Sequence, residues 1–126
     1  MPAHNRIRRL WWSATAVYAI AMGVVSLIPI PQVGPQIPSL DNVFHVLEYF
    51  LFGWLLMRAQ FSVGREGSPA ARMTVVVALL YGAFLEIMQA ALPYRDAEGL
   101  DILANVAGAV IAAVVAQLPL KDIAHG

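Results

Sequence analysis

Four long apolar runs alternate with shorter polar segments along the chain. The runs cover residues 10–28, 41–57, 73–92 and 100–118. At a rise of ~1.5 Å per residue, three of them would reach roughly 28–30 Å as helices, which is the thickness of the hydrocarbon core of a bilayer. The second reaches ~25 Å when Asp41 and Asn42 are counted in its first turn, and Arg58 can extend toward the polar surface at its other end. The pattern predicts an all-α fold, an integral membrane four-helix bundle.

The composition agrees with a membrane location and excludes several other classes. Of the 126 residues, 60% are hydrophobic and 13% are charged, whereas soluble domains are ~45–50% apolar. The formal net charge is zero, so no basic face for nucleic acid is expected. The absence of cysteine excludes disulfides and thiolate sites. With no repeat and no long linker, we expect one transmembrane domain over residues 1–126.

The basic residues indicate the direction of the four spans. Those that flank one side are Arg6, Arg8, Arg9, Arg58, Arg65, Arg72 and Lys121. Arg95 is alone on the other side, so the positive-inside rule predicts that both termini are cytoplasmic and that segments 29–42 and 93–99 lie outside. The first run follows the basic segment HNRIRR and resembles a signal peptide. It is too long for a typical apolar region of a signal and no clear A-x-A site follows, so we expect a retained helix.

Acidic, amide and imidazole side chains interrupt the last three runs at a single depth. They are Asp41, His45 and Glu48, then Glu86 and Gln89, then Asp101 and Asn105. In the predicted orientation each lies within about 10 Å of the outer boundary. The first three share a helix face at spacings of i, i+4 and i+7, and the last two repeat that spacing with Gly108. Because an ionised group at mid-bilayer costs roughly 3 kcal/mol or more, we predict that these polar faces converge on one pocket that opens outward.

Glu86 and His45 are the candidate catalytic residues. A carboxyl group in an apolar environment can exchange a proton and serve as a general acid or base. The alternative is a structural role, in which Glu86 accepts a hydrogen bond from a neighbour such as His45. His45, Glu48 and Glu86 also suggest a divalent metal site, but a single histidine at H-x-x-E spacing is weak support. We therefore expect no cofactor.

The other polar residues are candidate ligand-binding groups: Asp41, Glu48, Gln89, Arg95, Asp101 and Asn105. The amides of Gln89 and Asn105 offer donors and acceptors without titrating. Arg95 suits a phosphate or carboxylate, or else forms a salt bridge with a nearby acid. Asp41 and Asp101 are equally suited to cap or stabilise the first turn of their helices.

Together these residues resemble the VanZ-like family. The pattern consists of D-x-x-x-H (Asp41, His45) with Glu48, E-x-x-Q (Glu86, Gln89), P-x-R (Pro93, Arg95) and D-x-x-x-N-x-x-G (Asp101, Asn105, Gly108). It runs from Asp41 to about Val115, and it departs from the family where Asn42 replaces a common lysine. The family comprises small bacterial membrane proteins named after a teicoplanin-resistance protein. The resemblance implies a plasma-membrane protein of the cell envelope, but not that this chain confers glycopeptide resistance.

Three functions remain compatible with the sequence. The first is an outward-facing pocket that binds or processes an amphiphilic envelope ligand, such as a lipid-linked cell-wall precursor or a lipid head group. The second is a non-catalytic module that sequesters a lipid or glycopeptide or recruits a partner. The third is a structural polar lock with no ligand. A transporter is disfavoured because the inner halves of the runs show no matching polar groups. Membrane lipids are expected partners, and nucleic acid is not.

Overall fold

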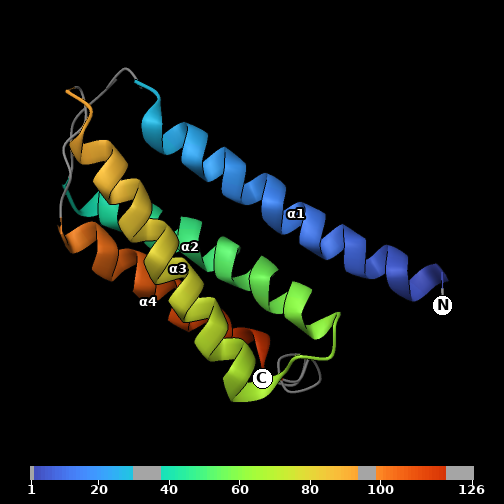
Figure 1. Ribbon diagram of the computed structural model, residues 1–126. Helices are drawn as coiled ribbons and strands as arrows, with labels where there is room; N and C mark the ends of the chain where they lie inside the picture. The colour runs from blue at the N-terminus through green and yellow to red at the C-terminus, as the bar shows by residue number, and fades with distance from the viewer. Residues whose placement is uncertain (1, 30–37, 94–98, 119–126) are drawn as a thin grey trace.

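Four α-helices make up the described part of the chain. The structure is a computed structural model that describes residues 2–29, 38–93 and 99–118, with the side chains of residues 2, 38–41, 99 and 100 outside the description. The helices are α1 (Pro2–Leu27), α2 (Pro38–Phe61), α3 (Gly67–Ala90) and α4 (Gly99–Ala116). Consecutive helices run in opposite directions (Figure 1). The prediction of an all-α fold with four helices is confirmed, and the described residues contain no strand.

A short turn at residues 62–66 joins α2 to α3. Gly64 and Gly67 have φ of 81° and 64°, values in the left-handed region that glycine adopts without steric cost. The amide of Gly64 donates to the carbonyl of Phe61 at 3.0 Å, and the amide of Arg65 donates to the carbonyl of Gln60 at 2.9 Å. These bonds satisfy the last carbonyl groups of α2. The turn therefore reverses the chain directly into α3.

Helix α2 is the centre of the fold. It packs against the other three helices and most extensively against α4, whereas α1 contacts α2 and α3 and, within the described residues, does not contact α4. The close approach of α2 and α4 depends on Gly53 and Gly108. A Cβ atom on Gly108 would overlap the carbonyl oxygen of Val46, and one on Gly53 would lie 2.9 Å from the Cβ of Ala112. The two helices thus meet almost main chain to main chain, as small residues permit in membrane bundles.

Apolar side chains lie on the outer surface as well as in the core. Buried Met22, Tyr49, Phe52, Ala78 and Ala109 form the larger core cluster. Exposed large apolar side chains occur on every helix: they include Val17, Ile20, Leu47, Leu80, Ile87 and Leu103. A helix that is apolar all round belongs in a protein interior or in a membrane.

Two helices are long and apolar enough to cross a membrane. They are Ala3–Leu27 and Gly67–Ala90, and Asp101–Ala116 is a shorter apolar helix. Length and composition are the basis of this finding. The expected set of four spans, with both termini in the cytoplasm, therefore stays a prediction.

The end of the bundle that holds Arg58, Arg65 and Arg72 is called the basic end below. Here the guanidinium carbon of Arg58 lies 5.2 Å from the ring centre of Trp11 and 5.7 Å from that of Trp54, which links α1 to α2 through cation–π contacts. Gln60, just beyond the predicted run 41–57, adds a polar contact in this half that the sequence interpretation did not include. Gln60 is buried, and its Nε2 donates to Thr74 Oγ1 at 2.8 Å and to the carbonyl of Ala70 at 3.1 Å. These bonds join α2 to α3, and Gln60 Oε1 is buried with no hydrogen-bond partner in the described part of the chain.

Candidate functional site at the acidic end

Acidic, amide and imidazole groups from three helices gather at the opposite end of the bundle, called the acidic end below. Because the helices alternate in direction, the first half of α2, the last half of α3 and the first half of α4 lie at the same end (Figure 1). The residues concerned are His45, Glu48 and Tyr49 on α2, Glu86 on α3, and Asp101 and Asn105 on α4. The antiparallel order of the helices is therefore what brings these distant parts of the sequence together.

His45 and Asp101 form an ion pair between α2 and α4. Their Nε2 and Oδ2 atoms are 3.7 Å apart, and their side chains are 27% and 13% exposed. This distance is too long for a hydrogen bond, so the attraction is mainly electrostatic and depends on a protonated imidazole. Asp101 also lies in the first turn of α4, where its charge favours the helix dipole. The Asp101 side chain can therefore stabilise the first turn of α4 and pair with His45 at the same time.

The other ring nitrogen of His45 faces inward. Nδ1 is buried and has no hydrogen-bond partner among the described side chains and backbone. The side chain of Asp41, one turn before His45, lies outside the description. Buried nitrogen atoms are normally hydrogen-bonded, so Nδ1 has hydrogen-bonding capacity that the described residues do not use.

Asn105 occupies the contact between α2, α3 and α4. Its side chain is almost completely buried. A Cβ atom on Gly82 would lie 2.8 Å from Asn105 Nδ2 and 3.3 Å from the hydroxyl of Tyr49, so the missing side chain of Gly82 leaves the space that both polar groups use. Asn105 Oδ1 is buried with no hydrogen-bond partner in the described part of the chain. The amide therefore has acceptor capacity to spare.

Two carboxyl groups, those of Glu48 and Glu86, lie near Tyr49. Glu48 and Glu86 both act electrostatically on the Tyr49 hydroxyl, and Glu48 also acts on Tyr18 and Tyr81. The Tyr18 hydroxyl donates to the backbone carbonyl of Glu48 at 2.8 Å. One carboxylate oxygen of Glu86, Oε1, is buried. Glu48 and Glu86 thus lie close to tyrosine hydroxyls where α1, α2 and α3 meet.

Gln89 points to a different neighbour. Its Nε2 donates to the backbone carbonyl of Ser26 on α1 at 2.9 Å, and the Tyr81 hydroxyl, also on α3, donates to the carbonyl of Ala19 on α1. The hydrogen bond of Gln89 is thus made to α1, whereas the His45–Asp101 pair joins α2 to α4. A ligand-binding role for Gln89 stays a prediction. Arg95 and the side chain of Asp41 lie outside the described residues.

The sequence analysis missed three tyrosines, Tyr18, Tyr49 and Tyr81. Each lies within an apolar run and was passed over as part of it. A signal was nevertheless present, because a tyrosine hydroxyl within an apolar segment needs a hydrogen-bond partner and should be counted with the polar groups.

The described residues do not support a metal centre. Within them, no group of three His, Asp or Glu side chains is positioned to hold a metal ion, so His45, Glu48 and Glu86 do not form such a group.

Fold and site together define an all-α protein with an apolar outer surface and polar groups gathered at one end. A family model described as VanZ/LLP1 matches residues 4–120, and the chain belongs to the VanZ-like family. The resemblance inferred from the sequence is confirmed. The family and the two long apolar helices indicate a membrane protein, and the family name suggests a link to the cell envelope or to antibiotic resistance. Searches of curated proteins and of solved structures give no match.

Proposed function

We propose that the acidic end is an outward-facing pocket of a multi-pass protein in the bacterial plasma membrane, and that it binds or processes an amphiphilic envelope ligand. A lipid-linked cell-wall precursor or a lipid head group has the required chemistry. The observation that carries the proposal is the pair of buried polar atoms, His45 Nδ1 and Asn105 Oδ1, with no hydrogen-bond partner in the described part of the chain. Buried polar atoms normally have partners, and a polar head group would supply them.

Each polar residue has a role in this proposal. His45 and Glu86 handle a proton, because an imidazole and a carboxyl group can exchange one near neutral pH when the surroundings favour it. Asp101 orients His45 through their ion pair. Asn105 Oδ1 accepts a hydrogen bond from the ligand, and Arg95 binds the anionic group of the ligand. Asp41, Glu48 and Gln89 complete the set of ligand-binding groups: they border the pocket or position its neighbours.

A non-catalytic module would use the same pocket to sequester a lipid or a glycopeptide, or to recruit a partner. The third function, a structural lock, has its own support. Gln89 and Tyr18 both donate hydrogen bonds to the backbone of a neighbouring helix, and such bonds stabilise helix packing whether or not a ligand binds.

The variant Glu86→Gln separates a working site from a structural lock. It keeps the shape of the side chain and removes the titrating group. If Glu86 handles a proton or binds the ligand, the variant should stay folded and lose its effect on the cell. Thermal unfolding in detergent measures the first property. The sensitivity of cells to lipid-targeting antibiotics, compared with a deletion strain, measures the second.

Glu66→Gln is the matched control, since Glu66 is exposed and lies at the basic end. It should leave both properties unchanged. A Glu86→Gln protein with full cellular effect and equal or higher stability would contradict the proposal. Neutralising a buried structural carboxylate removes a desolvation cost of several kcal/mol, and that gain is the signature of a lock.

A further inference from the structure

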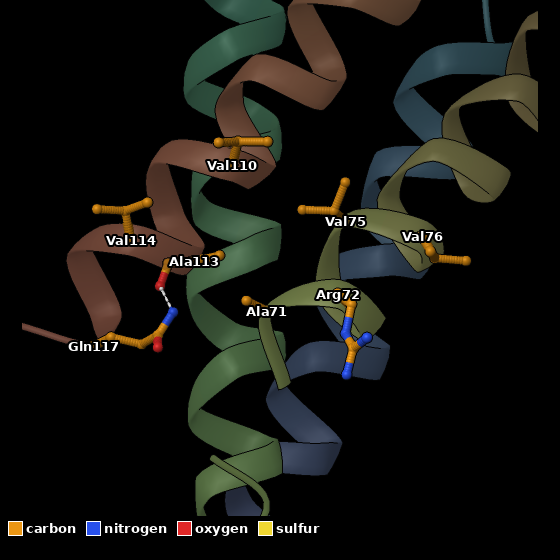
Figure 2. A pocket seen from close by; sticks show the side chains of 8 residues that line it. All are labelled: Ala71, Arg72, Val75, Val76, Val110, Ala113, Val114 and Gln117. Atoms are coloured by element: carbon orange, nitrogen blue, oxygen red, sulfur yellow. Dashed lines mark hydrogen bonds between the residues drawn. The ribbon is translucent and has the colours of Figure 1, made fainter. Parts of the chain in front are cut away.

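A second candidate site lies at the basic end, in a groove between α3 and α4. Its volume is about 360 Å³, within the range of ~300–1,000 Å³ typical of ligand pockets. The groove is lined by Val75 and Val76 from α3 and by Val110 and Val114 from α4, and Figure 2 shows the Val75 side chain on the side of α3 that faces α4. Its lining is almost entirely apolar, and it is distinct from the acidic end.

Polar groups occur at only one end of this groove. Arg72 and Gln117 lie at the same end in Figure 2, beyond the valines. The Gln117 amide nitrogen donates to the carbonyl of Ala113 at 2.8 Å. Arg72 is exposed and forms no ion pair or hydrogen bond within the described residues. By contrast, Arg58 lies over two tryptophan rings. The groove thus combines an apolar channel with a cation at its mouth.

We propose that this groove binds an anionic phospholipid, with an acyl chain along the valines and the phosphate on Arg72. A guanidinium fits a phosphate with two parallel hydrogen bonds. Arg72 lies in the second turn of α3, whose first residue is Gly67, so it is near the end of a helix long enough to cross a membrane. A lipid head group would lie at that level. The inference requires a membrane location but is independent of the ligand at the acidic end.

Charge argues against a second copy of the chain as the occupant. Most homodimers have twofold symmetry and bring the same patch of each subunit together. A dimer on this groove would bring two Arg72 side chains to one interface without a matching acid from the groove. An anionic lipid neutralises the charge instead.

The test compares two lipids with the same acyl chains on the purified full-length protein. Dioleoyl phosphatidylglycerol is anionic and dioleoyl phosphatidylcholine is zwitterionic, and native mass spectrometry in mild detergent counts the molecules retained. We expect the wild type to retain phosphatidylglycerol preferentially. Arg72→Gln should weaken its retention roughly tenfold, because a hydrogen bond to a charged group commonly contributes enough for that factor.

Arg8→Gln is the charge-matched control. Arg8 is exposed on α1, and α1 does not contact α4 in the described part of the chain. This variant should bind phosphatidylglycerol as the wild type does. Equal retention of the two lipids by the wild type, or unchanged retention by Arg72→Gln, would overturn the proposal.

A second variant tests the apolar part of the groove. Val114→Trp should fill the channel and reduce lipid retention, whereas Val17→Trp, at an exposed position on α1, should not. Both positions are on the surface, so both variants should keep the unfolding temperature of the wild type. Two outcomes would refute the inference. Displacement of the lipid by inorganic phosphate alone would mean that the groove binds phosphate rather than a lipid. A dimer that Val114→Trp disrupts would mean that a second copy of the chain occupies the groove.

Discussion

At Gly108 a single hydrogen atom in place of a methyl group decides how closely two helices approach. A Cβ atom there would overlap the carbonyl oxygen of Val46 and lie 2.9 Å from the amide nitrogen of Phe50. Both neighbours are main-chain atoms, so no flexible side chain can move aside. Gly108→Ala should therefore lower the free energy of unfolding by about 1–3 kcal/mol, the usual cost of overpacking. Denaturation in detergent, followed by circular dichroism, measures the change.

The adjacent residue provides the control. Ala107 is exposed on the other side of α4, so Ala107→Leu adds more volume than Gly108→Ala but should leave the stability unchanged. If the two variants were equally stable, the contact between α2 and α4 would be looser than the structure indicates.

The sequence predicted which polar residues share a depth but not which atoms meet. Helical spacing predicted that His45, Asp101 and Asn105 face one site, and the structure has His45 Nε2 at 3.7 Å from Asp101 Oδ2. Gln89 lies only three residues from Glu86, yet it bonds to Ser26 on α1. The neighbour of a given helix face depends on the lateral order of the helices, and periodicity along one helix contains no information about that order. The space at Gly82 for Asn105 and Tyr49 is likewise a property of three helices together.

At the level of the helices, the presence of each helix was easier to predict than the residues at which it begins and ends. Each apolar run overlaps one helix, but α1 begins at Pro2, well before the run that starts at residue 10. The intervening basic segment contains good helix formers such as arginine and alanine. An apolar run marks the part of a helix that avoids water, and hydrogen bonding continues the helix beyond it.

Arg58 of α2 links the N-terminal half of α1 to the bundle through Trp11. Arg58 contacts Trp11 on α1 and Trp54 on its own helix, and such a contact contributes about 0.5–2 kcal/mol. Arg58→Gln should therefore let this part of α1 separate more often. Hydrogen–deuterium exchange should become faster across the N-terminal half of α1, and the tryptophan emission should shift as the two rings change environment.

Arg65→Gln serves as the comparison for this prediction. Arg65 is exposed, and its Nη1 lies 3.3 Å from the sulfur of Met73 on α3, so its loss should not alter α1. Faster exchange in both variants would indicate a general effect of charge rather than the ring contacts.

For the molecule as a whole, the proposed orientation can be tested directly. The chain has no cysteine, so each introduced cysteine is a unique label. Cysteines at Gln36 and Glu98 should react with an impermeant thiol reagent added to intact cells, because the positive-inside rule places these segments outside. A cysteine at Ser68 should react only after the membrane is opened. The reverse pattern would invert the topology and place the acidic end inside.

The lateral arrangement of the helices could not be predicted from the sequence. Short connections favour antiparallel packing of consecutive helices, so the antiparallel order can be predicted from the sequence. The central position of α2 involves close contacts between distant helices, such as Gly53 with Ala112 and Gly108 with the backbone of Val46. Complementary surfaces of this kind cannot be recognised from the periodicity of either helix alone.

The contact of α2 with α4 also has a consequence for how the protein is made. The ribosome synthesises α2 and α3 before α4. The contact of α2 with α4, the most extensive helix pair in the fold, therefore forms late. Until then His45 lacks Asp101, and the backbone around Val46 lacks Gly108. If α2 spans the membrane as proposed, a nascent chain interrupted after α3 would expose polar groups to lipid, where each costs free energy. Membrane proteases that act on poorly packed helices would cleave such fragments readily. Packing of α4 against α2 would protect the complete chain from them.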